Sequence, residues 1–263
     1  ARRTTGLDGQ NGQVALACHA TGCLAVQQRG PWLVGFRLDA TGKVLDPKGF
    51  LIANGRGDSQ SLAVGANGKD FFVVHGQGAF ALVGTQVART VSADGKVGVA
   101  RELASKSSLG AYPTIGFDGT DWVVAWTDQR AGTSQVLMQR FAADGAPRDG
   151  DGTVLVDGLS SPTASMRCVS GAGCWIAAGD GTNGRLLHVK GTTIDRGPAT
   201  VAYSPLGLVP TATGLAVLGS AADGTKVFTH GADLAATGTP KTVHPMPTRV
   251  GALLEQTTGY LAV

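Results

Sequence analysis

The sequence predicts an all-β protein built from repeated four-stranded sheets, and the main observation behind this prediction is a repeat. Six times, a glycine in a short polar turn is followed at once by an apolar run typical of a buried strand. The intervals between these glycines are 46, 51, 54, 41 and 45 residues. The glycines are Gly22, Gly68, Gly119, Gly173, Gly214 and Gly259. A period of this length is that of β-propeller blades, which is therefore the predicted fold class.

Composition supports the same fold. The chain has 263 residues, of which 40 are glycine and 16% are charged, and its only glutamates are Glu102 and Glu255. Amphipathic helices usually contain more Glu, Lys and Leu. Because neighbouring blades bury a continuous core between them, we predict one domain over residues 1–263. The expected repeats are residues 14–58, 59–108, 109–160, 161–205, 206–247 and a partial repeat 248–263.

Within a repeat, the order of the pieces can be followed beyond the first hairpin. In the first repeat a third strand is expected over Leu33–Leu38 and a fourth near Phe50–Ile52. The turn between them contains Asp39 and Gly42, and related turns recur at 92–96 and 142–146. Asp supplies local hydrogen bonds in such turns and Gly supplies a positive φ, so we interpret these aspartates as turn residues and not as catalytic ones. The repeats around Gly191 and Gly231 keep less of the pattern.

The number of blades follows from counting hairpins. Six hairpin turns but only five third-and-fourth-strand units favour six blades, with five as the alternative. The sixth blade would be incomplete, or closed by the N-terminal segment. An open edge would favour pairing with another chain, so a partner chain completing the last blade is a further expectation.

The four cysteines indicate the compartment. Cys18 and Cys23 flank the first polar turn, and Cys168 and Cys174 flank the fourth. Each pair would lie on adjacent strands of one hairpin, within disulfide reach, which suits an oxidising compartment. The alternative is one zinc site, but the spacings are looser than Cys-x2-Cys and the pairs lie three blades apart. We therefore predict two disulfides in an extracellular, cell-surface or periplasmic protein whose signal peptide has been removed.

Charge and hydropathy exclude two further classes of partner. The net charge is only +3 and basic residues are not clustered, which does not favour nucleic-acid binding. No apolar run approaches the length of a membrane span.

Catalytic motifs are not found. The sequence contains no Gly-x-Ser-x-Gly, His-Glu-x-x-His or phosphate-binding glycine loop, and its five histidines share no spacing. A glycosidase would have to rely on Asp alone, because both glutamates fall outside the second-strand motif. We predict no cofactor and no metal, and an enzyme is not the favoured interpretation.

A candidate ligand site follows the second strand of the third repeat. Trp126, Asp128 and Arg130 leave this strand together, and an aromatic face beside a donor and an acceptor suits a sugar. The alternative, which we favour, is structural: Trp126 packs between blades, and Asp128 with Arg130 fixes the loop.

The third repeat, from Pro113 through Trp122-Val-Val-Ala-Trp126 to Asp144-Gly145, resembles the repeat-built propellers of secreted and surface proteins of myxobacteria and related bacteria. The cysteine-bracketed hairpins are similar to those of such proteins. This resemblance implies a propeller scaffold outside the cytoplasm, but a fold does not fix a function.

Taken together, these features predict a binding or adhesion module that recognises a glycan or a protein through loops on one propeller face. A structural subunit of a surface assembly is the alternative, and a glycosidase or lyase is the third class.

Overall fold

The computed structural model describes residues 14–54, 61–80, 83–104, 111–129, 132–160, 162–246, 253–256 and 259–262. These residues form five four-stranded antiparallel sheets, here called blades 1 to 5, and a two-stranded sheet.

The strands follow one another in chain order within each blade. Blade 1 contains β1 (Val14–His19), β2 (Gly22–Arg29), β3 (Trp32–Asp39) and β4 (Phe50–Asn54). Blade 2 contains β5 (Leu62–Ala66), β6 (Phe71–Phe80), β7 (Val83–Val91) and β8 (Arg101–Glu102). Blade 3 contains β9 (Ala111–Phe117), β10 (Asp121–Asp128), β11 (Gln135–Ala142) and β12 (Thr153–Val156). Blade 4 contains β13 (Thr163–Val169), β14 (Gly173–Gly179), β15 (Gly184–Lys190) and β16 (Thr193–Val201). Blade 5 contains β17 (Ser204–Thr211), β18 (Gly214–Ala221), β19 (Gly224–Gly231) and β20 (Ala236–His244), and the last sheet contains β21 (Leu253–Gln256) and β22 (Gly259–Ala262).

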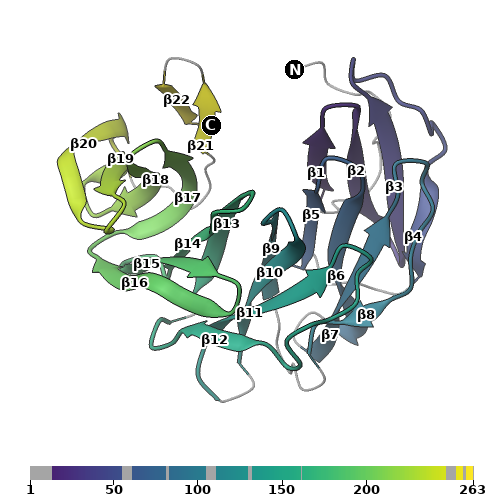
Figure 1. Cartoon of the computed structure of the whole chain (residues 1–263), viewed down its shortest axis with the longest axis horizontal. Coiled ribbons are helices and arrows are strands. Elements are labelled where there is room, and N and C mark those ends of the chain that lie inside the picture. Colours follow the sequence, from purple (N-terminus) through teal and green to yellow (C-terminus); the bar gives the residue numbers. More distant parts are fainter. Residues whose placement is uncertain are drawn as a thin grey trace.

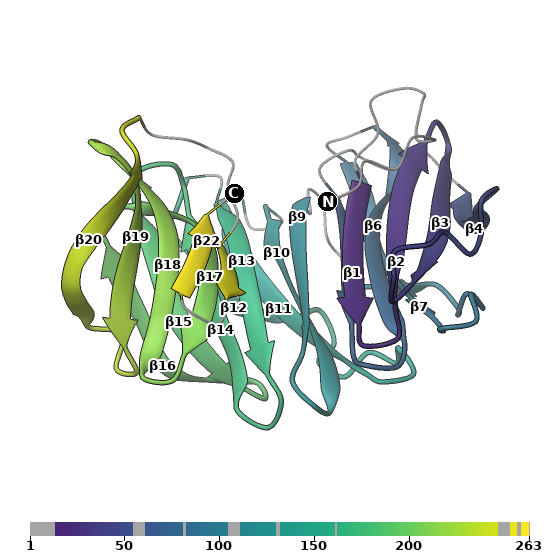
Figure 2. The same cartoon turned by 90° about the horizontal axis from the view of Figure 1, so that it is seen from above.

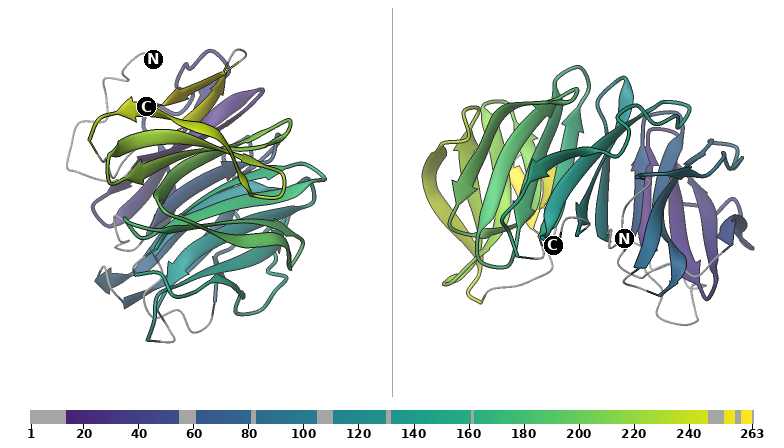
Figure 3. Two further views of the ribbon diagram at one scale, coloured as in Figure 1. Left: turned by 90° about the vertical axis from the view of Figure 1, so that its left-hand side faces the viewer. Right: turned by 90° about the horizontal axis from the view of Figure 1, so that it is seen from below.

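The blades are arranged as a fan (Figure 1). The first strand of each blade lies near the middle of the fan and the fourth lies at its rim. Each first strand contacts the first strand of the next blade, from β1 through β5, β9, β13 and β17 to β21. Figures 2 and 3 show that the strands run roughly perpendicular to the plane of the fan. This is the arrangement of a β-propeller, as the sequence predicts.

Each interface between neighbouring blades encloses one apolar cluster. Leu24 and Val73 belong to the cluster between blades 1 and 2. Trp122 belongs to the cluster between blades 2 and 3, where it is fully buried and stacks on Phe72 with ring centroids 5.1 Å apart. The second strands supply most of this apolar surface, because they are covered on both faces: every residue of β10, and every residue of β14, is buried. This double burial explains why the second strands appear in the sequence as continuous apolar runs.

Turn glycines set how closely the rims of neighbouring blades approach. Gly95 has φ +88°, and a Cβ there would lie 3.2 Å from Nε of Arg37 in blade 1. Gly145 has φ +87°, and its Cβ would lie 3.1 Å from a methyl carbon of Thr90 in blade 2. Both the backbone conformation and the narrow space therefore favour glycine at these turns.

At two of these interfaces, an arginine of one blade donates a hydrogen bond to the next blade. Arg37 forms a two-point ion pair with Asp46 of its own blade (2.7 and 2.8 Å) and donates from Nη1 to the carbonyl oxygen of Ala93 in blade 2 (3.1 Å). In blade 4, Arg196 donates in the same way to the carbonyl oxygen of Ala232 in blade 5 (2.9 Å).

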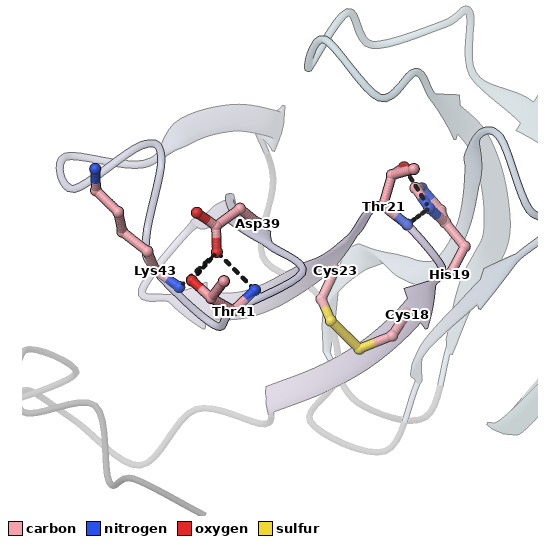
Figure 4. The surroundings of a disulfide bond; sticks show 7 residues. All are labelled: Cys18, His19, Thr21, Cys23, Asp39, Thr41 and Lys43. Atoms are coloured by element: carbon pink, nitrogen blue, oxygen red, sulfur yellow. Dashed lines mark hydrogen bonds between the residues drawn. A yellow bond between two sulfur atoms is a disulfide. The ribbon is translucent and has the colours of Figure 1, made fainter.

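Both predicted disulfides are present. Cys18 is bonded to Cys23 and Cys168 to Cys174, and each pair occupies directly opposed positions of one hairpin. Figure 4 shows the first bond beside the turn in which the Asp39 carboxylate accepts hydrogen bonds from the backbone nitrogens of Thr41 and Lys43 (2.9 and 3.0 Å). The aspartate is thus a turn residue, as predicted.

The expected strand order also holds, including the third and fourth strands of blade 1. The weaker repeats around Gly191 and Gly231 form complete blades, although β17 begins at Ser204, before the expected start at 206. The N-terminal segment expected to close the last blade lies outside the described residues, so its pairing and that of a partner chain stay predictions.

We expect the Arg37–Asp46 pair to contribute pH-dependent stability. The hydrogen bonds from Arg37 lower the pKa of Asp46 below the ordinary aspartate value of 3.8. A carboxyl with a lowered folded-state pKa stabilises the fold above its unfolded-state pKa, and this contribution disappears as the pH falls through the folded-state value. Asp46→Asn should therefore lower the free energy of unfolding at pH 7 by about 1 kcal/mol, because the pair is partly solvent-screened.

Urea unfolding at a series of pH values measures this difference. The gap between Asp46→Asn and the parent should narrow below pH 3.8. Asp157→Asn, at an exposed position, is the control and should change stability little at any pH. A constant gap across the whole range would contradict the assignment.

Candidate functional site

A cavity of about 480 Å³ lies where blade 4 meets the outer half of blade 5. This volume is in the range of small-molecule sites. The lining residues come from the end of β16, the β16–β17 connection, β19, the β19–β20 turn and β20. They are Thr200, Val201, Ala202, Tyr203, Phe228, Thr229, His230, Leu234, Ala235, Ala236, Gly238 and Pro240.

A bulge in β20 opens one wall of the cavity. In the register of β19 and β20, Val227 pairs with Lys241 and Thr229 pairs with Thr237. One residue of β19, Phe228, therefore faces three residues of β20, which include Gly238 and Pro240. Pro240 has no N–H to donate and Gly238 has φ +72°, so neither residue favours a regular ladder here. Phe228, opposite this irregularity, is only partly buried.

Tyr203 forms another wall. Its ring stacks on that of Phe228 with centroids 3.7 Å apart and an interplanar angle of 7°. On the sheet beneath lies Gly219 of β18, where an added Cβ would come within 2.8 Å of Tyr203 Cε2. The missing side chain at Gly219 therefore lets the tyrosine lie against the sheet. Tyr203 is only 4% exposed.

A chain of hydrogen bonds connects Tyr203 to the turn between β19 and β20. The Tyr203 hydroxyl lies 2.7 Å from Nε2 of His230, and Nδ1 of the same ring lies 3.0 Å from the carbonyl oxygen of Leu234. Leu234 has φ +68° and inserts its side chain into the apolar cluster between blades 4 and 5. Burial raises the pKa of Tyr203 well above its usual value of 10, so its hydroxyl stays protonated.

The cavity is uncharged. Its described lining contains no Asp, Glu, Lys or Arg, and His230 has no ion pair among the described residues. The first strands of blades 1 to 5 likewise contain neither Asp nor Glu. Among the described residues, no group of three His, Cys, Asp or Glu is placed to hold a metal ion. The described residues also contain no helix that is long and apolar enough to cross a membrane.

A charged cluster lies elsewhere in the same interface. Nδ1 of His188 lies 2.6 Å from a carboxylate oxygen of Asp195, and the Arg196 guanidinium lies 5.5 Å from the ring centroid of Trp175. His188 and Trp175 are buried, and Arg196 reaches the turn of blade 5. These contacts connect β16 to β14, to β15 and to blade 5.

The structure places two of the three sequence-predicted ligand residues in the interior. Trp126 and Asp128 are both 0% exposed, and Nε1 of Trp126 donates to Oδ2 of Asp128 (3.1 Å). Trp126 packs in the cluster between blades 2 and 3, so its ring has no exposed face. Arg130 lies outside the described residues. The three residues together as a sugar site therefore stay a prediction, and the cavity beside Tyr203 is the better candidate.

No protein-family model matches this chain, and no curated protein matches it in sequence. Solved structures are similar to it in fold. The Aleuria aurantia lectin, in complex with Fucα1-6GlcNAc, gives a TM-score of 0.57 at 9% identity, over 96% of this chain and 94% of the lectin chain. A subtype N10 neuraminidase-like protein of A/little yellow-shouldered bat/Guatemala/060/2010 gives 0.57 at 10% identity, over 91% and 85% of the two chains. The Synechocystis apocarotenoid oxygenase gives 0.59 at 11% identity, over 97% and 65%. At such identities these likenesses establish the β-propeller fold alone, which lectins and enzymes share.

Sequence reasoning missed the cavity residues. Tyr203 precedes β17 directly and His230 is the penultimate residue of β19, so no spacing links them. The one local signal was Gly238-Thr-Pro240, because a glycine and a proline two residues apart inside a strand indicate a bulge.

We expect Gly219→Ala to disturb this site through Tyr203. The added Cβ overlaps the tyrosine ring, and overpacking of this kind typically costs about 1–3 kcal/mol. Chemical denaturation measures the loss. Removing the obstructing ring should remove most of the effect, so Gly219→Ala should cost much less in a Tyr203→Ala background. Equal costs in the two backgrounds would show that the close approach is not what makes Gly219 necessary.

Proposed function

We propose that this protein is a carbohydrate-binding module that holds a sugar in the cavity beside Tyr203. The observation that carries the proposal is the cavity itself, which combines aromatic and aliphatic walls with a few fixed polar atoms and no charge. Sugars present C–H faces and hydroxyl edges, so a site of this composition complements both.

Binding without turnover fits the site better than hydrolysis. Glycoside hydrolysis generally uses two carboxyl groups across the scissile bond. The described lining of the cavity has none, and neither do the first strands of the five complete blades. A lectin-type function needs no such groups.

Three further observations support an exported binding protein. The lectin named above shares the fold and is solved with a fucosylated disaccharide. Two disulfides suit an oxidising compartment, and hence an extracellular, cell-surface or periplasmic location. The third repeat resembles that of secreted bacterial propellers. A role in adhesion to glycans at a cell surface follows from this proposal.

The proposed function can be tested by placing a large side chain at an exposed position of the cavity lining. Ala236 is exposed and lines the cavity, so Ala236→Trp should occupy the space without altering the buried residues. Ala222→Trp, on the exposed β18–β19 turn of the same blade, adds the same side chain outside the cavity and is the matched control.

A glycan array identifies the bound sugar, and titration calorimetry then measures each variant. Ala236→Trp should weaken binding at least about tenfold, because the side chain competes for the space that the sugar needs. Ala222→Trp should bind like the parent. Absence of saturable binding to any glycan, or equal affinity of both variants, would contradict the proposed function.

A further inference from the structure

The direction of each hydrogen bond in the cavity decides which atoms are left for a ligand. The carbonyl oxygen of Leu234 can only accept, so Nδ1 of His230 carries the hydrogen. His230 is 5% exposed and contacts no carboxylate among the described residues, and an unpaired charge is costly to bury, so the ring is neutral. Its Nε2 then has a lone pair, and the Tyr203 hydroxyl must donate to it. Tyr203 Oη is left with lone pairs only.

Thr229 Oγ1 is also left with lone pairs only. Its hydroxyl donates to the carbonyl oxygen of Thr237 on the neighbouring strand. The hydroxyl hydrogens of Thr229 and Tyr203 are therefore both used within the protein. Thr200, the other side-chain hydroxyl of the lining, is exposed at the rim and remains free to rotate.

We infer that the cavity beyond its rim residue Thr200 offers hydrogen-bond acceptors and no free side-chain donor, and that it therefore selects uncharged sugars whose hydroxyl groups donate to Tyr203 Oη and Thr229 Oγ1. Acidic sugars such as uronic acids are rejected. This inference rests on the proposed function and adds the class of sugar. A ligand carboxylate has only acceptor atoms at neutral pH, so beside Tyr203 and Thr229 it would face lone pairs, with no side-chain donor or positive charge there to pair with. Leaving such a group unpaired in a partly buried site is costly.

The first test concerns the unliganded protein. Long-range ¹H–¹⁵N spectra of the histidine rings at pH 7, with His230→Gln for assignment, report which ring nitrogen carries the hydrogen. We expect His230 to be neutral with the hydrogen on Nδ1. A hydrogen on Nε2, or on both nitrogens, would free the Tyr203 hydroxyl to donate to a ligand and would overturn the inference, whatever the protein binds.

The second test uses matched sugars and calorimetry. The probes are methyl glucoside, galactoside, mannoside and fucoside, the uronic acid counterparts of the first three, and monodeoxyfluoro derivatives of each. Fluorine cannot donate a hydrogen bond. For the neutral sugar that binds, we expect at least tenfold weaker binding of the derivative with fluorine at the position that donates to Tyr203. Where that sugar has a uronic acid counterpart, the acid should also bind at least tenfold more weakly.

Tyr203→Phe links that penalty to one atom. This variant removes Oη and keeps the ring on Phe228, so the parent sugar should bind more weakly and the fluorine penalty should disappear. Thr200→Val at the rim is the control and should keep the penalty. Where Tyr203→Phe does not fold, Thr229→Val serves for the second acceptor. Uronic acids or fluorinated sugars that bind as well as their parents would overturn the inference while leaving carbohydrate binding intact. Absence of all sugar binding would instead contradict the proposed function, and the His230 measurement would still decide the inference.

Discussion

The face-to-face packing of neighbouring blades is the constraint on which the rest of this structure depends. A four-stranded sheet has two faces, and a second strand such as β14 or β18 is covered on both of them. A blade therefore cannot bury its apolar surface alone and is stable only between neighbours. Everything at the rim must allow that approach, which is why the turn glycines lie against the preceding blade. The arginine contacts at the rim are secondary, because ion pairs near the surface contribute little compared with apolar burial.

The cavity arises from the same constraint, at a place where the packing is incomplete. Between blades 1 to 4 the facing side chains fill the interfaces as apolar clusters. Between blades 4 and 5 the inner half is filled in the same way, but the register of β20 shifts opposite Phe228, where the cavity lies. Tyr203 and Leu234 occupy part of the space, and their polar partner His230 is satisfied on both ring nitrogens. The lining therefore belongs to strands β16, β19 and β20, to the β16–β17 connection and to the β19–β20 turn, and the hydrogen bonds of His230 join this connection to this turn.

The sequence predicted those parts of the fold whose cause is local. Apolar runs marked the second strands because burial on both faces favours apolar residues, and cysteines on either side of a turn fall into register once a hairpin forms. Most side-chain contacts between two blades could not be predicted from the sequence. Trp126 is an exception, because its favoured interpretation from the sequence was packing between blades, and it does lie in the cluster between blades 2 and 3. Tyr203 and His230 are in contact because the connection from blade 4 packs against blade 5. The sequence around Gly231 keeps little of the repeat pattern and did not indicate the turn whose Leu234 side chain packs in the cluster between these blades.

The absence of charge from the described cavity lining is more informative than its shape. Propellers with lectin and enzyme functions resemble this chain about equally well, so the fold does not choose between these classes. Hydrolytic chemistry at a glycosidic bond needs groups that gain and lose protons near neutral pH. In this cavity the tyrosine pKa is raised by burial, and the neighbouring histidine is engaged on both nitrogens. Polar atoms fixed in this way can recognise a ligand, because their hydrogens already point in one direction. The geometry of these hydrogen bonds therefore supports the proposed role in recognition.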